Sequence, residues 1–125
     1  MKQLLTLLVA FISINTLAQD ADCEKFKTGK FKYEDPNHGL IVVKRDKDSQ
    51  VETTQQGKIE IHSTIKWLSE CKYVLTYKKV VNADVPELIG DKMTVEIIEN
   101  RGNKYTCRVT NQNGYTGTIE VLKVE

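Results

Sequence analysis

The stretch Ile59-Glu60-Ile61-His62-Ser63-Thr64-Ile65-Lys66-Trp67 contains the clearest strand signal in this chain. Four apolar residues and Ser63 occupy every second position of this stretch, and polar residues stand between them. Successive side chains of a β-strand point to opposite faces of the sheet, so this stretch would bury one face and expose the other. A half-buried strand is therefore expected here.

Similar alternation surrounds this strand on both sides. Immediately downstream, Tyr73, Leu75 and Tyr77 alternate with other residues, which predicts a second strand paired with the first. Turn residues interrupt the pattern at short intervals, and Asn113-Gly114 is the strongest hairpin signal among them. The remaining strands are expected over residues 29–33, 40–45, 50–54, 92–99, 104–110 and 115–123, of which 50–54 is polar and edge-like.

These segments amount to about eight strands in consecutive, hairpin-like order, so the predicted fold class is all-β, an antiparallel meander. Such a meander hides its edges by closing into an up-and-down barrel or by forming two sheets. The short connections favour a small lipocalin-like, calycin-type barrel, with an open curved sheet or a sandwich as the alternative. Short helical turns are expected at residues 22–26 and 86–89.

The beginning of the chain has the composition of a targeting segment. Lys2 precedes a nearly continuous apolar run from Leu4 to Ile14, and Thr16 and Ala18 place small residues before a cleavage point. The run is shorter than the roughly 20 apolar residues that span a bilayer. We expect a cleaved signal peptide over residues 1–18, a single antiparallel β domain over residues 19–125, and no stable membrane insertion after cleavage.

The charge balance argues against nucleic acid as a partner. The chain has 18 basic and 17 acidic residues, and removing Lys2 with the signal peptide leaves 17 of each. Nucleic-acid binding calls for a clustered basic excess, which a balanced surface does not supply. Lys30 and Lys32 belong to a local basic stretch, but they alternate with Phe31 and Tyr33, as the solvated face of a strand would.

All three cysteines lie in the predicted exported domain, where an oxidising compartment favours disulfides. An odd number leaves at least one thiol free or paired between chains. Cys23 and Cys71 lie just outside strand-like runs and are the expected pair, whereas Cys107 alternates with Tyr105 and Val109 and is expected to be a free, buried thiol. A catalytic thiol is the rival interpretation, but no motif places a histidine to activate one.

Aromatic residues are the remaining candidates for a binding site, because most of them fall on the apolar register of their strands. An eight-stranded barrel is just wide enough either to be filled by side chains or to hold one small ligand. A packed core is one possibility, and a cavity with tyrosine hydroxyls on its wall is the other. The residues expected to line such a cavity are Phe31, Tyr33, Trp67, Tyr73, Tyr77, Tyr105 and Tyr115.

Residue patterns that support catalysis or metal binding are weak in this sequence. His38 and His62 have no cysteine or carboxylate at ligand spacing. Asp46 and Asp48 lack the glycine and glutamate that complete a calcium loop. The serines lie in no nucleophile motif. We therefore expect no enzymatic activity, no metal site and no cofactor.

Two segments carry a resemblance to known proteins: Cys23-Glu24-Lys25-Phe26-Lys27-Thr28-Gly29-Lys30-Phe31-Lys32-Tyr33 and Trp67-Leu68-Ser69-Glu70-Cys71-Lys72-Tyr73-Val74-Leu75-Thr76. They resemble a family of small exported proteins from Bacteroidota that have no established function. Members of that family often carry the automated label of DNA topoisomerase IV. Such an enzyme needs a nucleotide-binding domain and a metal-binding carboxylate cluster over many hundreds of residues, whereas this chain has 125 residues and no Gly-rich phosphate loop. The residues here contradict the label.

The expected function is that of an exported, non-enzymatic binding module for a small apolar or amphipathic ligand, located in the periplasm or secreted. The alternative is an envelope-associated interaction or structural module with a filled barrel core, which would use its outer face or the edge at residues 50–54. The first hypothesis names a small lipophilic ligand as the partner and the second an envelope protein. The volume of the barrel interior distinguishes them.

Overall fold

The computed structural model describes residues 22–125, except residues 55 and 57. The signal peptide predicted over residues 1–18 and the predicted start of the mature chain at Gln19 lie outside the described residues. Within the described part, no helix has both the length and the apolar character that crossing a membrane requires.

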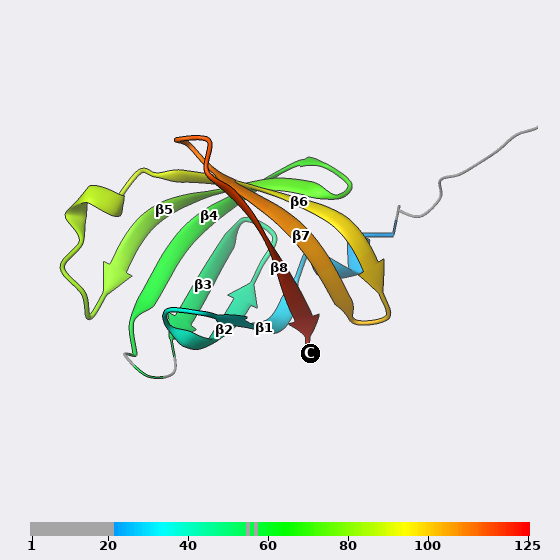
Figure 1. Cartoon of the computed structure of the whole chain (residues 1–125), viewed down its shortest axis with the longest axis horizontal. Coiled ribbons are helices and arrows are strands. Elements are labelled where there is room, and N and C mark those ends of the chain that lie inside the picture. Colours follow the sequence, from blue (N-terminus) through cyan, green and yellow to red (C-terminus); the bar gives the residue numbers. More distant parts are fainter. Residues whose placement is uncertain (1–21, 55, 57) are drawn as a thin grey trace, which may run out of the picture.

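Eight antiparallel strands close into a barrel, which confirms the predicted all-β fold class (Figure 1). Each strand pairs with the next along the chain, and this up-and-down order is consistent with a lipocalin-like barrel. Two short 3-10 helices, η1 and η2, lie close to the predicted helical turns. The elements are η1 (Glu24–Phe26), β1 (Gly29–Asp35), β2 (Gly39–Arg45), β3 (Ser49–Thr54), β4 (Glu60–Ser69), β5 (Lys72–Val81), η2 (Pro86–Leu88), β6 (Lys92–Arg101), β7 (Lys104–Asn111) and β8 (Thr116–Lys123).

Closure of the barrel removes the edge that the sequence predicts at residues 50–54. This segment forms β3, which pairs with β2 on one side and with β4 on the other, so that Glu52 lies opposite both Val43 and Ile61. Gln50 and Thr54 are buried. The expectation of an edge strand was wrong because alternate polar residues of β3 face the barrel interior, where the sequence pattern suggests an exposed strand.

The alternation in the Ile59–Trp67 stretch holds in β4. Ser63 and Ile65 are buried, while Thr64 and Lys66 between them are exposed. The pairing shifts register after Trp67, where Leu68 is an extra residue in β4 and is 53% exposed. A β-bulge of this kind bends its strand and increases the local twist, which helps a sheet to curve into a barrel. The bulge thus explains why Leu68, which follows the alternating apolar residues of β4, is exposed.

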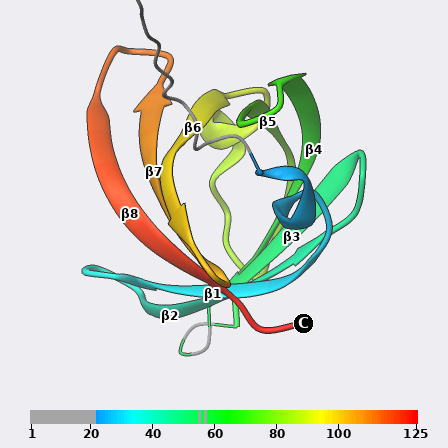
Figure 2. The ribbon, with the colours of Figure 1, turned by 90° about the vertical axis from the view of Figure 1, so that its right-hand side faces the viewer.

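The segment before β1 closes one end of the barrel (Figure 2). Phe26 of η1 is fully buried, and its ring centroid lies 4.8 Å from that of Tyr105. A disulfide joins Cys23 to Cys71, with 5.3 Å between the Cα atoms, and ties this segment to the turn between β4 and β5. The predicted disulfide is therefore confirmed, and Cys107 is a free, buried cysteine.

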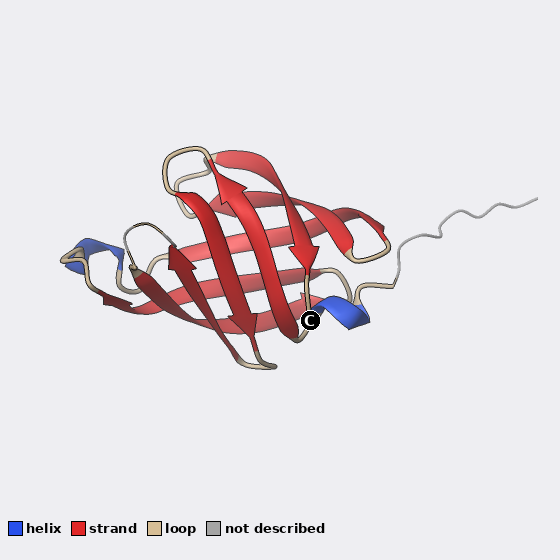
Figure 3. Ribbon diagram, turned by 90° about the horizontal axis from the view of Figure 1, so that it is seen from below, coloured by secondary structure: helices blue, strands red, loops and turns tan. Residues whose placement is uncertain are grey.

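The opposite end of the barrel carries η2 and the turns that follow β1, β3, β5 and β7 (Figure 3). Because η1 covers one end only, the interior has a closed end and an open end. Gly29 fixes the chain at the closed end, where a Cβ atom would lie 2.5 Å from the carbonyl oxygen of Glu125. Its φ of +128° also lies in a region that L side chains rarely adopt. Glycine at this position therefore permits β1 to start against the end of the chain.

Candidate functional site

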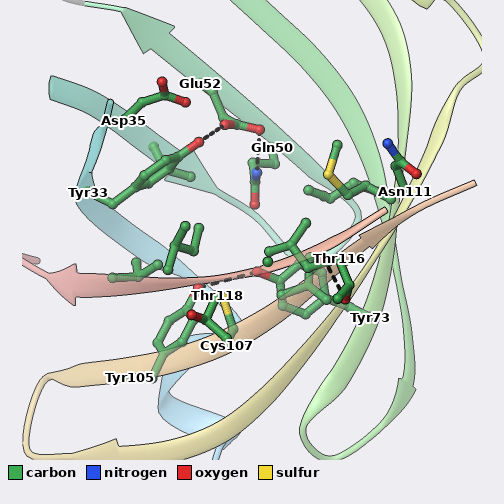
Figure 4. Close-up of a pocket in the computed structure, with 18 of the residues that line it drawn as sticks. Tyr33, Asp35, Gln50, Glu52, Tyr73, Tyr105, Cys107, Asn111, Thr116 and Thr118 are labelled. Atoms are coloured by element: carbon green, nitrogen blue, oxygen red, sulfur yellow. Dashed lines mark hydrogen bonds between the residues drawn. The ribbon is translucent and has the colours of Figure 1, made fainter. Parts of the chain in front are cut away.

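The barrel interior contains a cavity of about 540 Å³ (Figure 4). Arg45, Tyr73 and Tyr105 form its floor, towards the η1 end, and Asp35 and Tyr115 lie at its mouth, towards the opposite end. Pockets for small molecules commonly have volumes of about 300–1,000 Å³, with apolar walls and a small number of placed polar groups. The cavity therefore has the size of a small-molecule site, and the barrel is not filled by its own side chains.

Five of the seven aromatic residues expected to line a cavity do so: Tyr33, Tyr73, Tyr77, Tyr105 and Tyr115. Phe31 and Trp67 do not line it, which corrects the sequence-based expectation. Phe31 is fully buried, and the guanidinium carbon of Arg45 lies 4.2 Å from its ring centroid. Trp67 packs on Tyr73 with ring centroids 4.6 Å apart, and the Lys27 ammonium lies 5.1 Å from its ring. Both residues thus pack at the closed end of the barrel.

Tyr115 reaches the cavity mouth from a turn, whereas the alternation predicts a strand position for it. It is 81% exposed, and β8 begins one residue later at Thr116. The side chain of Asn111 accepts hydrogen bonds from the backbone N–H groups of Asn113, at 2.9 Å, and Tyr115, at 3.0 Å. This asparagine-centred turn occupies the N–H of Tyr115, while the Tyr115 carbonyl accepts from the backbone N–H of Asn111 at 2.9 Å, so Tyr115 closes the turn just before β8 begins.

Arg45 was not predicted as a site residue, yet it organises the cavity floor. Its side chain is buried, and its Nε donates to the Oε1 of Gln50 at 2.8 Å. Nη1 donates to the backbone carbonyl of Phe26 at 2.8 Å, so the arginine also holds η1 against the barrel. Nη2 donates to the hydroxyls of Tyr73, at 3.2 Å, and Tyr105, at 3.1 Å. Residues from five elements therefore meet around one guanidinium.

A polar wall runs from this floor toward the mouth along β3 and β1 (Figure 4). We use the name polar wall for Gln50, Glu52 and Tyr33. Gln50 donates through Nε2 to Glu52 at 3.1 Å, and the Tyr33 hydroxyl donates to the other carboxylate oxygen of Glu52 at 2.6 Å. The charges of Arg45 and Glu52 are consequently linked through the amide of Gln50.

The sequence contains only a faint signal for these polar residues. Arg45 stands two positions after Val43, in register with the buried side chains of β2, but a charged residue at the end of a strand ordinarily extends into solvent. Gln50 and Glu52 alternate with Val51, a pattern that would place the valine inside. In the structure Gln50, and not Val51, faces the interior. Gln50 lies directly opposite Arg45 on the neighbouring strand β2, and the two side chains are hydrogen-bonded.

Burial keeps the buried tyrosines of the cavity and its thiol neutral at neutral pH, because it raises the pKa of each of them. It raises the pKa of Tyr77 to about 12, an effect that the negative charge of Glu52 increases. Burial likewise raises the pKa of the Cys107 thiol to about 12, although Arg45 opposes that shift. Burial lowers the pKa of Arg45, but Tyr73 and Tyr105 more than offset this effect, and its pKa is above the ordinary value. The interior therefore combines neutral hydroxyls and a thiol with a permanent cation.

Neither histidine lines the cavity, although His38 contacts Asp35 at its mouth. His38 is within 3.3 Å of Asp35 in the turn after β1, and His62 is within 2.9 Å of Glu60 on β4. Comparison with protein-family models, with curated proteins and with solved structures finds no match for this chain. The geometry of the cavity is therefore the basis for interpreting the site.

Proposed function

We propose that this protein is an exported, non-enzymatic binding module that takes a small apolar or amphipathic molecule into its barrel. The observation that carries this proposal is the cavity of about 540 Å³, which has a closed floor and a mouth at the η2 end. Apolar side chains such as Leu75, Val95 and Val121 supply most of the driving force for binding, because they would exclude water from an apolar ligand.

The distribution of polar groups favours an amphipathic ligand over a purely apolar one. The polar wall lies on β1 and β3, whereas Met93, Val95 and Val109 lie on β6 and β7. A ligand with a polar end or edge could satisfy hydrogen-bonding groups on one side of the cavity and bury its apolar part against the other. The alternative, an envelope module with a filled core, has less support because the cavity occupies the interior.

Export is part of the proposal for two independent reasons. The first residues have the pattern of a signal peptide, and the Cys23–Cys71 disulfide is of a kind that persists in oxidising compartments. Mass spectrometry of the protein recovered from the periplasm and the medium should give a mature chain beginning at Gln19. A mature chain that retains residues 4–14 would contradict soluble export.

Binding is tested with a neutral apolar fluorophore such as N-phenyl-1-naphthylamine, whose emission rises when it leaves water. We expect saturable binding to the wild-type barrel. In Val109→Trp the added ring occupies the cavity, so affinity should fall by about tenfold or more, since loss of buried apolar contacts of ~1.4 kcal/mol suffices for that factor.

Arg108→Trp is the matched control for this experiment. Arg108 neighbours Val109 on β7 but is exposed and pairs with Glu96 on the outside of the barrel at 3.1 Å. The control adds the same bulk without filling the cavity, so it should bind the fluorophore like the wild type. Absence of binding to the wild type, or equal affinity in Val109→Trp and Arg108→Trp, would contradict a site inside the barrel.

A further inference from the structure

The guanidinium of Arg45 lacks a direct counterion in the described part of the chain. Arg45 is 4% exposed, and it belongs to none of the salt bridges formed by residues 22–125 outside positions 55 and 57. A buried charge without a close partner is costly, because water and counterions no longer solvate it. The carboxylate of Glu52 is linked to Arg45 only through Gln50.

Among the residues that the structure describes, the cavity floor has more hydrogen-bond donors than acceptors. A guanidinium has five N–H groups, and those of Arg45 make four hydrogen bonds, to Gln50, Phe26, Tyr73 and Tyr105. One N–H of Nη1 is therefore left over. The hydroxyls of Tyr73 and Tyr105 lie 3.3 Å apart, and only one of them can donate to the other, so one hydroxyl proton is also left over.

Both leftover donors belong to residues that line the closed end of the cavity, since Arg45, Tyr73 and Tyr105 are all part of its lining. A ligand group that satisfies both must accept hydrogen bonds, and a carboxylate accepts through two oxygens without bringing a proton of its own. Hydrogen bonds between a guanidinium and a carboxylate are also roughly twice as strong as those between neutral groups. We propose that the ligand of the barrel is an amphipathic carboxylic acid whose carboxylate lies against Arg45 and the Tyr73–Tyr105 pair.

This inference rests on the proposed function and gives the ligand an orientation. The carboxylate would enter first and reach the floor, and the apolar tail would extend past Val95 and Val109 toward the mouth. Glu52 opposes an anion, but both of its oxygens already accept hydrogen bonds, from Gln50 and from Tyr33. The charge on the floor itself is that of Arg45, whereas Glu52 is linked to the floor only through Gln50 and Asp35 lies at the mouth.

The experiment compares ligands that share one tail and differ in the polar end. Decanoate, methyl decanoate, decanol and decylamine are titrated at neutral pH against the wild-type barrel carrying N-phenyl-1-naphthylamine. We expect decanoate to displace the fluorophore with an affinity about tenfold above that of the methyl ester, because a charge-assisted hydrogen bond exceeds a neutral one by about that factor. Decylamine should bind more weakly than the ester.

Equal affinities for decanoate and its methyl ester would overturn the proposal that the floor binds a carboxylate, and would indicate a site for a neutral hydrogen-bond acceptor. Binding of decylamine more tightly than of the methyl ester would overturn the proposed carboxylate in favour of a cation held by Glu52. In both results the fluorophore still binds, so the proposed function survives. Failure of the fluorophore and of all four compounds to bind, measured also by calorimetry, would overturn the proposed function together with this inference.

A variant of Arg45 tests whether this residue causes the preference for decanoate over its methyl ester. Arg45→Gln should lose most of the tenfold preference for decanoate over the ester, measured as the ratio of their two affinities for the same variant, a ratio that a merely structural role would not change. Arg108→Gln, which removes an exposed arginine from the outside of the barrel, should keep the preference. If Arg45→Gln does not fold, the wild-type ligand series still decides the inference.

Discussion

Removing the disulfide should release the closed end of the barrel. The bond joins Cys23, which is fully buried beside η1, to Cys71 in the turn between β4 and β5. η1 is a single short turn. It is linked to the barrel wall by the disulfide, by the hydrogen bonds from Arg45 to Phe26 and from Lys123 to Lys25, and by the packing of Phe26 on Tyr105. The perturbation is the double variant Cys23→Ala/Cys71→Ala.

The expected loss of stability follows from the length of chain that the disulfide closes. The two cysteines are 48 positions apart, and in the chain-entropy model a loop of this size contributes roughly 4 kcal/mol. Measured effects commonly fall below that value because the reduced, unfolded chain retains structure. We therefore expect the double variant to lose about 2–4 kcal/mol, which corresponds to a drop in Tm of roughly 10–25 °C for a domain of this size.

Urea unfolding followed by far-UV circular dichroism and by the fluorescence of Trp67 measures this loss. Trp67 reports on the closed end, because it contacts Tyr73 and lies beneath Lys27, the residue that follows η1. Cys107→Ala is the matched control, since it removes a buried sulfur and leaves the disulfide intact. A loss below about 1 kcal/mol in the double variant, or a smaller loss than in Cys107→Ala, would refute the reasoning.

Three further predictions concern the closed end, the cavity and the free thiol. Gly29→Ala should cost about 1–3 kcal/mol in urea unfolding, because its Cβ would meet Glu125, whereas Gly102→Ala has open space and should cost less. Between pH 10 and about pH 12 the unfolded chain releases the Tyr77 proton that the folded chain keeps, so stability should fall with rising pH less steeply in Tyr77→Phe than in the wild type. Cys107 should react with a thiol reagent slowly in the native protein and rapidly in denaturant, and equal rates would contradict its burial.

Local alternation was sufficient to predict the strands and the class of fold. The predicted alternation holds in β4 from Ser63 to Lys66, because a half-buried strand must place every second side chain on the same face. The pairing of Cys23 with Cys71 was likewise predictable, since both cysteines flank strands and Cys107 stands within an apolar register. These features depend on neighbours in the sequence, so a reader of the sequence alone can find them.

The polar interior required the tertiary structure. Arg45 is 28 positions from Tyr73 and 60 from Tyr105 along the chain, and only closure of the barrel brings the three side chains together. A buried arginine is stable only with hydrogen-bond acceptors around it, and no local pattern announces acceptors that come from β3, β5, β7 and η1. The sequence by itself therefore determined the strands and the disulfide, whereas barrel closure decided which polar residues face inward, because burial of a polar group depends on partners distant in the chain.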